Sequence, residues 1–100
     1  MSKLIPEQLI NEIPPLYSTE ELKEPTVYCK LFLGNWTWFI TEIDFNRDIC
    51  FGYVQSPFCD GELGYFTLSE IEEIRGPLGL EAERDLSFKP TLLSNIRNDS

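Results

Sequence analysis

Apolar and polar residues alternate through the middle of the chain, and this pattern predicts β-strands. The predicted strands are residues 26–33, 36–43, 49–54 and 63–68. Each is rich in β-branched and aromatic residues, and short turns separate them. One face of the first strand would carry Val27, Cys29, Leu31 and Leu33. Strands joined by such short turns pair with their neighbours in the chain, which indicates an antiparallel meander.

Apolar residues at helical spacing predict short helices before and after these strands. The expected helical segments are residues 6–13, 69–75 and 90–96, with a further helix start at residues 18–21. In the central helix, Ser69 and Glu72 have the spacing of a capping box, in which each side chain satisfies a backbone N–H. Ile71 and Ile74 would face the core together, and Gly76 would end the helix.

The composition sets the size of the core. The chain has 100 residues, of which 42% are hydrophobic and 13% aromatic, enough for one modest core. We therefore expect a single domain over residues 1–100 with an α+β fold. Its centre would be a four-stranded antiparallel meander, with the short helices packed on one face. Residues 85–88 can add a short edge strand to this sheet.

Four apolar side chains are candidates for either core packing or binding. Leu78 and Leu80 lie in a tight loop, where we expect them to fill the edge of the core, with a docking contact as the alternative. Trp36 and Trp38 alternate along a strand, so both rings point to one face. In the simpler interpretation that face belongs to the core. The alternative is that the pair stacks on a sugar, a base or an arginine of a partner.

The cysteines indicate a reducing compartment. The chain has three, an odd number, and its first residues, MSKLIP, do not resemble a signal peptide. No apolar run in the sequence is long enough to span a membrane. We therefore expect a cytoplasmic protein with free thiols, in which Cys29 and Cys50 are core residues and Cys59 is the most exposed of the three.

The charge balance points towards basic partners. Acidic residues outnumber basic ones by 17 to 8, which gives a formal net charge of −9. Such a surface repels phosphate groups, so we expect no direct binding to nucleic acid or to an anionic membrane. It attracts basic proteins, and Glu81, Glu83 and Asp85 form a dense cluster that could meet one. The alternative is that the charge only keeps the protein soluble. The sequence leaves homo-oligomerisation open.

The sequence offers little for catalysis. It contains no histidine, which excludes a Cys–His pair or a Ser–His–Asp triad within the chain. Glu42 with Asp44 and Asp60 with Glu62 are neighbouring carboxylates that could serve acid–base catalysis or bind a hard cation. Such pairs arise by chance in so acidic a sequence. We expect no cofactor and no metal ion.

Several stretches carry a resemblance to a known family. They are residues 4–6 (LIP), 14–17 (PPLY), 35–42 (NWTWFITE) and 61–90. In these stretches the chain resembles a family of small uncharacterised bacterial proteins, domain of unknown function 2958, often met on plasmids, conjugative elements and phages. The likeness covers nearly the whole chain. It implies a bacterial host and a mobile genetic element, and it brings no activity and no catalytic residues.

Our leading hypothesis is a non-enzymatic accessory factor that binds a protein with a basic surface, as an inhibitor or adaptor of a nucleic-acid-handling protein. The candidate contact residues are Trp36, Trp38, Leu78, Leu80, Glu81, Glu83 and Asp85. A small-ligand-binding domain that uses the Trp36/Trp38 face is the first alternative. An enzyme that uses paired carboxylates is the second.

Overall fold

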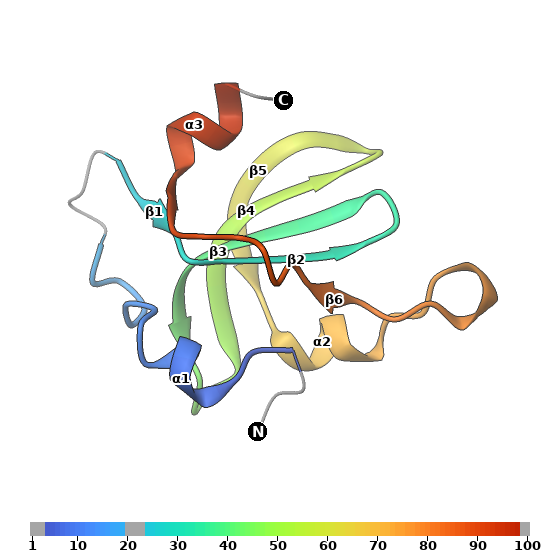
Figure 1. Cartoon of the computed structure of the whole chain (residues 1–100), viewed down its shortest axis with the longest axis horizontal. Helices are drawn as coiled ribbons and strands as arrows, with labels where there is room; N and C mark the ends of the chain where they lie inside the picture. Colours follow the sequence, from blue (N-terminus) through green and yellow to red (C-terminus); the bar gives the residue numbers. More distant parts are fainter. Residues whose placement is uncertain (1–3, 20–23, 99–100) are drawn as a thin grey trace.

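The computed structural model of the protein describes residues 4–19 and 24–98 (Figure 1). The strands are β1 (Thr26–Val27), β2 (Cys29–Leu33), β3 (Trp36–Asp44), β4 (Ile49–Ser56), β5 (Cys59–Phe66), β6 (Glu83–Arg84) and β7 (Thr91–Leu92). The helices are α1 (Glu7–Ile10), α2 (Leu68–Glu73), the short 3₁₀ turn η1 (Pro77–Gly79) and α3 (Leu93–Asn98). The helix start expected at residues 18–21 lies partly outside the described residues.

The strands form two antiparallel sheets. Among the described residues, the larger sheet has five strands in the order β5-β4-β3-β2-β6, and β1 pairs with β7 in a two-stranded sheet. The strands β2 to β5 follow one another in both the chain and the sheet. The short strand β6 returns from far along the chain to pair with β2. The protein is therefore α+β.

The first face of the larger sheet carries the main core. Leu31, Trp38 and Ile40 lie on this face and pack in one cluster with Ile5, which precedes α1, and Ile71 of α2. All five side chains are buried. Figure 1 shows α1 and α2 below the sheet. Burial of this apolar surface is the main source of stability for the fold.

The opposite face carries a second cluster, and this corrects one expectation. Phe39 and Tyr53 point away from the main core and pack with Val27 of β1 and Leu93 of α3. Ile96, also on α3, is partly buried against the same cluster. Figure 1 shows α3 above the sheet. The prediction that the helices pack on one face is therefore wrong, because α3 has its own apolar stripe and covers the second face.

The first predicted strand is interrupted at Tyr28. Val27 pairs with Thr91 in the small sheet, whereas Cys29 pairs with Ile40 in the larger one. The Tyr28 N–H donates to the Ile40 carbonyl oxygen (2.9 Å), so Tyr28 and Cys29 both lie opposite one residue, as in a β-bulge. Val27 and Cys29 therefore pack in different clusters, although simple alternation places them on one face.

The N-terminus of α2 is capped differently from the prediction. The N-cap residue is Thr67, whose hydroxyl accepts a hydrogen bond from the Glu70 N–H (3.1 Å). Ser69 lies within the first turn instead. Its N–H and its hydroxyl both donate to the carboxylate of Asp48, in the turn before β4. A carboxylate from a distant turn thus takes the place of the capping box, and it lies where the helix dipole favours negative charge.

The ends of the other elements also differ from the predicted ones. The chain leaves α2 after Glu73, since Ile74 has an extended backbone (φ −65°, ψ 137°), and the Ile74 side chain is exposed rather than part of the core. The helix α1 is shorter than residues 6–13, and α3 begins at Leu93 because β7 pairs with β1 first. The edge strand is β6 rather than residues 85–88. The Asp85 N–H still donates to the Lys30 carbonyl oxygen of β2 (2.9 Å), and the chain turns away after it.

The cysteines have the burial that the sequence predicts. Cys29 and Cys50 are buried and Cys59 is partly exposed, and each is unpaired. Burial raises the pKa of the Cys29 thiol to about 12, and burial beside the Asp48 carboxylate raises the pKa of Cys50 to about 12. The reactive thiolate form of both is therefore scarce at neutral pH.

This difference predicts a stepwise reaction with thiol reagents. At neutral pH the folded protein should react quickly at Cys59 alone, and all three cysteines should react after denaturation. Ellman's reagent with and without guanidinium measures both amounts. A single thiol in the denatured, unreduced protein would reveal a disulfide and contradict this structure.

Candidate functional site

A narrow arm, residues 74–82, extends from the body of the protein between α2 and β6 (Figure 1). Its two sides are held together by backbone pairing. Arg75 forms an antiparallel bridge with Glu81, and the Gly76 N–H donates to the Leu80 carbonyl oxygen (2.8 Å). The Arg75 guanidinium also pairs with the Glu81 carboxylate at 3.1 Å and donates to the Glu72 carbonyl oxygen at 2.6 Å. These contacts give the arm a defined shape.

The tip of the arm presents a leucine in an unfavourable backbone conformation. The Gly79 N–H donates to the Gly76 carbonyl oxygen (3.1 Å), which closes a four-residue turn with Pro77 second and Leu78 third. Leu78 has φ 62° and ψ 22°, a left-handed conformation that turns with proline in second place usually fill with glycine or asparagine. A leucine there costs about 1–2 kcal/mol. Its side chain is fully exposed (104%).

The structure thus overturns the expected packing of the arm leucines. Leu78 contributes nothing to the core, and Leu80 is 56% exposed, so neither fills its edge. The reason is geometric. The pairing of Arg75 with Glu81 directs the intervening loop away from the body. The alternative offered by the sequence, a docking contact, stays a prediction.

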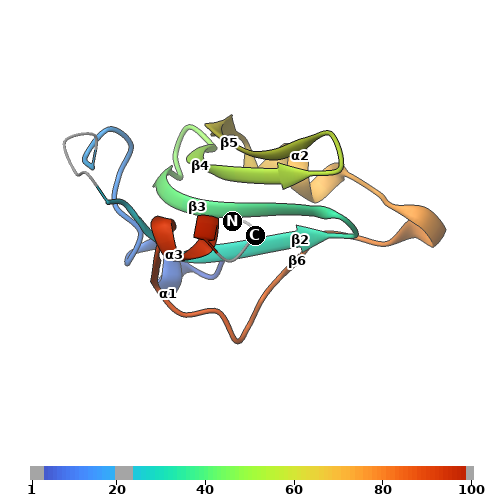
Figure 2. The same cartoon turned by 90° about the horizontal axis from the view of Figure 1, so that it is seen from above.

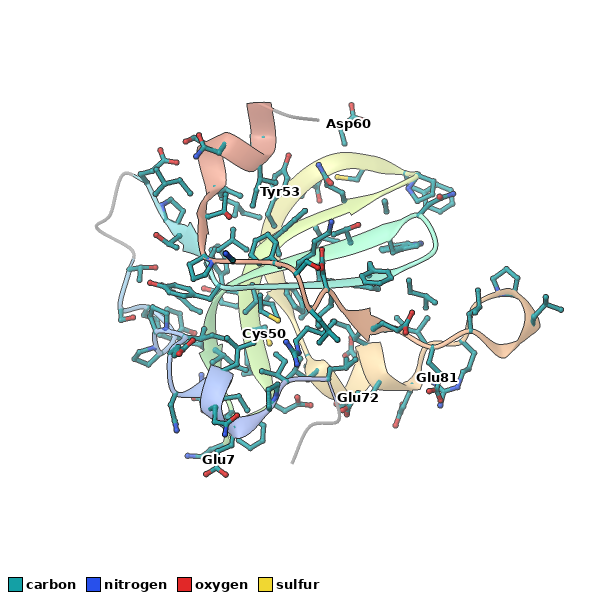
Figure 3. All side chains as sticks on the ribbon, in the orientation of Figure 1. Glu7, Cys50, Tyr53, Asp60, Glu72 and Glu81 are labelled. Carbon is teal, nitrogen blue, oxygen red and sulfur yellow. The ribbon has the colours of Figure 1, made fainter. Side chains whose placement is uncertain are left out.

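An acidic depression of about 330 Å³ lies at the base of the arm. It is lined by Leu4, Glu72, Glu81, Ala82, Glu83, Arg84 and Leu86. The Arg84 Nε–H donates to the Leu4 carbonyl oxygen (3.1 Å), which fixes one wall. Glu72 and Glu81 lie on the same side of the molecule in Figure 3. The arm therefore stands beside a patch that combines carboxylates with apolar side chains.

The three predicted acidic contact residues have different surroundings. Glu81 is paired with Arg75, and the Asp85 carboxylate lies 3.8 Å from the Lys30 ammonium and accepts the Ser87 N–H (2.9 Å). Glu83 is exposed on β6 and forms no ion pair within the described residues. Glu83 is therefore the member of this cluster whose charge is most available to a partner.

The two tryptophans are divided between core and surface. Both lie on the same face of β3, with ring centroids 6.0 Å apart and nearly parallel planes (22°). Trp38 is 4% exposed and belongs to the main core, whereas Trp36 is 39% exposed and covers it. The core interpretation is therefore confirmed for Trp38. Only Trp36 presents ring surface to solvent, so the pair does not form an open stacking platform.

Of the two predicted carboxylate pairs, Glu42 and Asp44 serve structural contacts, whereas Asp60 and Glu62 are exposed on β5. Glu42 is buried, and its carboxylate accepts hydrogen bonds from the Tyr17 N–H (2.9 Å), the Thr19 N–H (2.9 Å) and the Thr19 hydroxyl. Asp44 forms an ion pair with Arg47 (2.9 Å) in the next turn. Among the described residues, no group of three or more His, Cys, Asp or Glu side chains is placed to hold a metal ion.

Two exposed apolar residues were missed by the sequence analysis. Phe58, in the turn between β4 and β5, is 89% exposed, and Leu86, after β6, is 79% exposed. The signal was available, because an apolar residue inside a turn has no core position to fill.

These features define a small α+β protein with an exposed apolar arm beside an acidic patch. The chain belongs to the family described as protein of unknown function (DUF2958), whose model matches residues 5–96. No curated protein and no solved structure matches it. None of the helices in the described part of the chain is long and apolar enough to cross a membrane.

Proposed function

We propose that this protein is a non-enzymatic accessory factor whose arm docks into an apolar socket on a partner protein with a basic surface. Leu78 is the observation that carries the proposal. A leucine that is fully exposed and held in a left-handed conformation stabilises neither the core nor the turn. Its presence is explained if the side chain becomes buried in a complex.

The energy available from such docking is substantial. Full burial of a leucine side chain contributes about 1.5–3 kcal/mol. Leu80 on the arm and Leu86 in the depression at its base can add further apolar contacts. Because Arg75 and Glu81 hold the arm in one shape, little conformational entropy is lost when it binds.

The charge of the protein supports a basic partner. The net charge of −9 and the carboxylates at the base of the arm attract cationic surfaces over distances beyond direct contact. Glu83 is the natural contact for a partner's lysine or arginine, since it has no ion pair within the described residues. Association should therefore slow as salt is raised.

The setting of this function follows from the resemblance noted in the sequence. We propose a cytoplasmic protein of a plasmid, conjugative element or phage, which acts stoichiometrically on a nucleic-acid-handling protein. DNA-binding proteins carry basic clefts, and an acidic protein with a projecting apolar arm can occupy such a cleft without binding DNA itself.

The substitution Leu78→Asn separates binding from stability. Asparagine tolerates the left-handed conformation better than leucine, so the free energy of unfolding should stay equal or rise by up to about 1 kcal/mol. Capture of the partner from a bacterial lysate should fall at least about tenfold, the effect of losing one buried leucine. Urea denaturation and quantitative mass spectrometry of captured proteins measure the two effects.

A matched control is Leu92→Asn, which changes an exposed leucine on β7, away from the arm. This variant should capture the partner as well as the wild type. Glu83→Lys should slow association more than it speeds dissociation. The proposal fails if Leu78→Asn captures the same proteins in the same amounts as Leu92→Asn.

A further inference from the structure

The outer edge of β5 is a second surface with unused binding capacity. Among the described residues, β5 has a strand neighbour on one side only, β4, along Cys59–Phe66. In Figure 2 the β5 ribbon lies on the outer border of the sheet. At about 3.3 Å per residue, such a strand offers roughly 26 Å of edge. Edge strands of this length usually carry protection against pairing with another chain.

The side chains along this edge favour contact with an added strand. Leu63 and Tyr65 lie on the same face of β5 and are 45% and 58% exposed. Gly64, between them, points to the other face, where a Cβ atom would meet nothing within 4 Å. Apolar contacts are therefore available on one face of the edge, and free space on the other.

A cavity of about 310 Å³ lies at the end of β5. It is lined by Tyr17, Ile49, Tyr65, Phe66, Thr67 and Glu70. The Tyr17 and Tyr65 rings are 6.3 Å apart and inclined by 55°, and Phe51 supports Tyr65 from the side at 4.9 Å. Aromatic rings beside a carboxylate are the surroundings that a guanidinium group prefers, because it stacks on the ring faces and forms paired hydrogen bonds with the carboxylate.

We propose that an extended segment of a partner protein adds to the edge of β5 and places an arginine side chain in this cavity, between the tyrosines and Glu70. Backbone hydrogen bonds along β5 supply affinity, and the cavity supplies the choice of side chain, as in other cases of strand addition. This site is separate from the arm, so the inference does not depend on arm docking.

The charge of the protein decides between this occupant and a second copy of the chain. Each copy carries a net charge of −9, and the edge itself bears Asp60 and Glu62. Pairing β5 with its own copy would bring these acidic edges together, which is unfavourable. A segment with arginine meets the opposite charge instead.

Peptide titrations followed by amide NMR test the proposal. The probe is a set of blocked eight-residue peptides of alternating threonine and valine, with arginine placed at each position in turn. The best peptide should shift amide signals of residues 59–66 and of the cavity residues. The same peptide with citrulline, which has the shape of arginine without its charge, should bind at least tenfold more weakly.

Two variants on one helix supply the control. Glu70→Gln should weaken binding at least fivefold, whereas Glu73→Gln, also exposed on α2, should leave it unchanged. Leu78→Asn should bind the peptide like the wild type, which distinguishes this site from the arm. The proposal is overturned if the citrulline peptide binds as tightly as the arginine peptide, or if the shifted amide signals lie away from β5. A dimer in sedimentation that buries β5 would also overturn it.

Discussion

Replacing Gly52 with alanine is expected to destabilise the protein severely and to lower its melting temperature sharply. A Cβ atom at this position would lie 1.9 Å from the Phe39 carbonyl oxygen and 3.1 Å from the Ile40 Cα, both backbone atoms of β3. The register of β3 against β4 shifts between Ile40 and Glu42, which brings the two backbones close at Gly52. Relief requires separating the two central strands of the sheet.

The expected loss is more than about 4 kcal/mol, a large part of the 5–15 kcal/mol that stabilises a typical domain. Circular dichroism during heating measures it. Gly64→Ala is the matched control, since Gly64 pairs with Gly52 on the neighbouring strand and a Cβ atom there meets nothing within 4 Å. That variant should melt close to the wild type. Similar melting of both alanine variants would contradict the close approach of β3 and β4.

The substitution Glu42→Gln should produce the second largest loss, about 2–4 kcal/mol. The carboxylate accepts from two backbone N–H groups and one hydroxyl of residues 17–19. A glutamine side chain keeps one acceptor oxygen and replaces the other with an NH₂ group, so at least one of these partly buried donors faces another donor and loses its acceptor. The loop that carries Tyr17 should then detach from β3.

Urea denaturation measures this loss, and hydrogen exchange of the Tyr17 and Thr19 amides reports the release of the loop. Glu12→Gln, an exposed position after α1, controls for the change in charge. If both glutamine variants unfold at the same urea concentration, Glu42 does not anchor the loop.

The strands were largely predictable because alternation of apolar residues is a local signal. The departures occur where a single residue changes the register. The bulge at Tyr28 moves Val27 to the opposite face from Cys29, and no feature of the residue types there announces it. The apolar stripe of α3 could likewise be read from the sequence. Which face of the sheet α3 covers could not, because that depends on the path of the preceding chain.

The candidate site was predicted in part for similar reasons. The turn at Gly76 and the apolar character of Leu78 can be read from the sequence. Whether such a loop packs or projects depends on the pairing of Arg75 with Glu81, which is a tertiary feature. Glu42 was a catalytic candidate because it neighbours Asp44 in the sequence. Its structural role could not be predicted, since its hydrogen-bond donors are 23 and 25 residues away in the chain.

Photo-cross-linking from the tip of the arm tests the central claim most directly. A photoreactive amino acid replaces Leu78 in one variant and Asn46, in the exposed turn between β3 and β4, in the other. After irradiation in bacterial cells, position 78 should give a discrete adduct with one basic protein, and excess wild-type protein should suppress it. Position 46 should not give this adduct. Identical adducts from both positions, or none from position 78, would contradict a docking role for the arm.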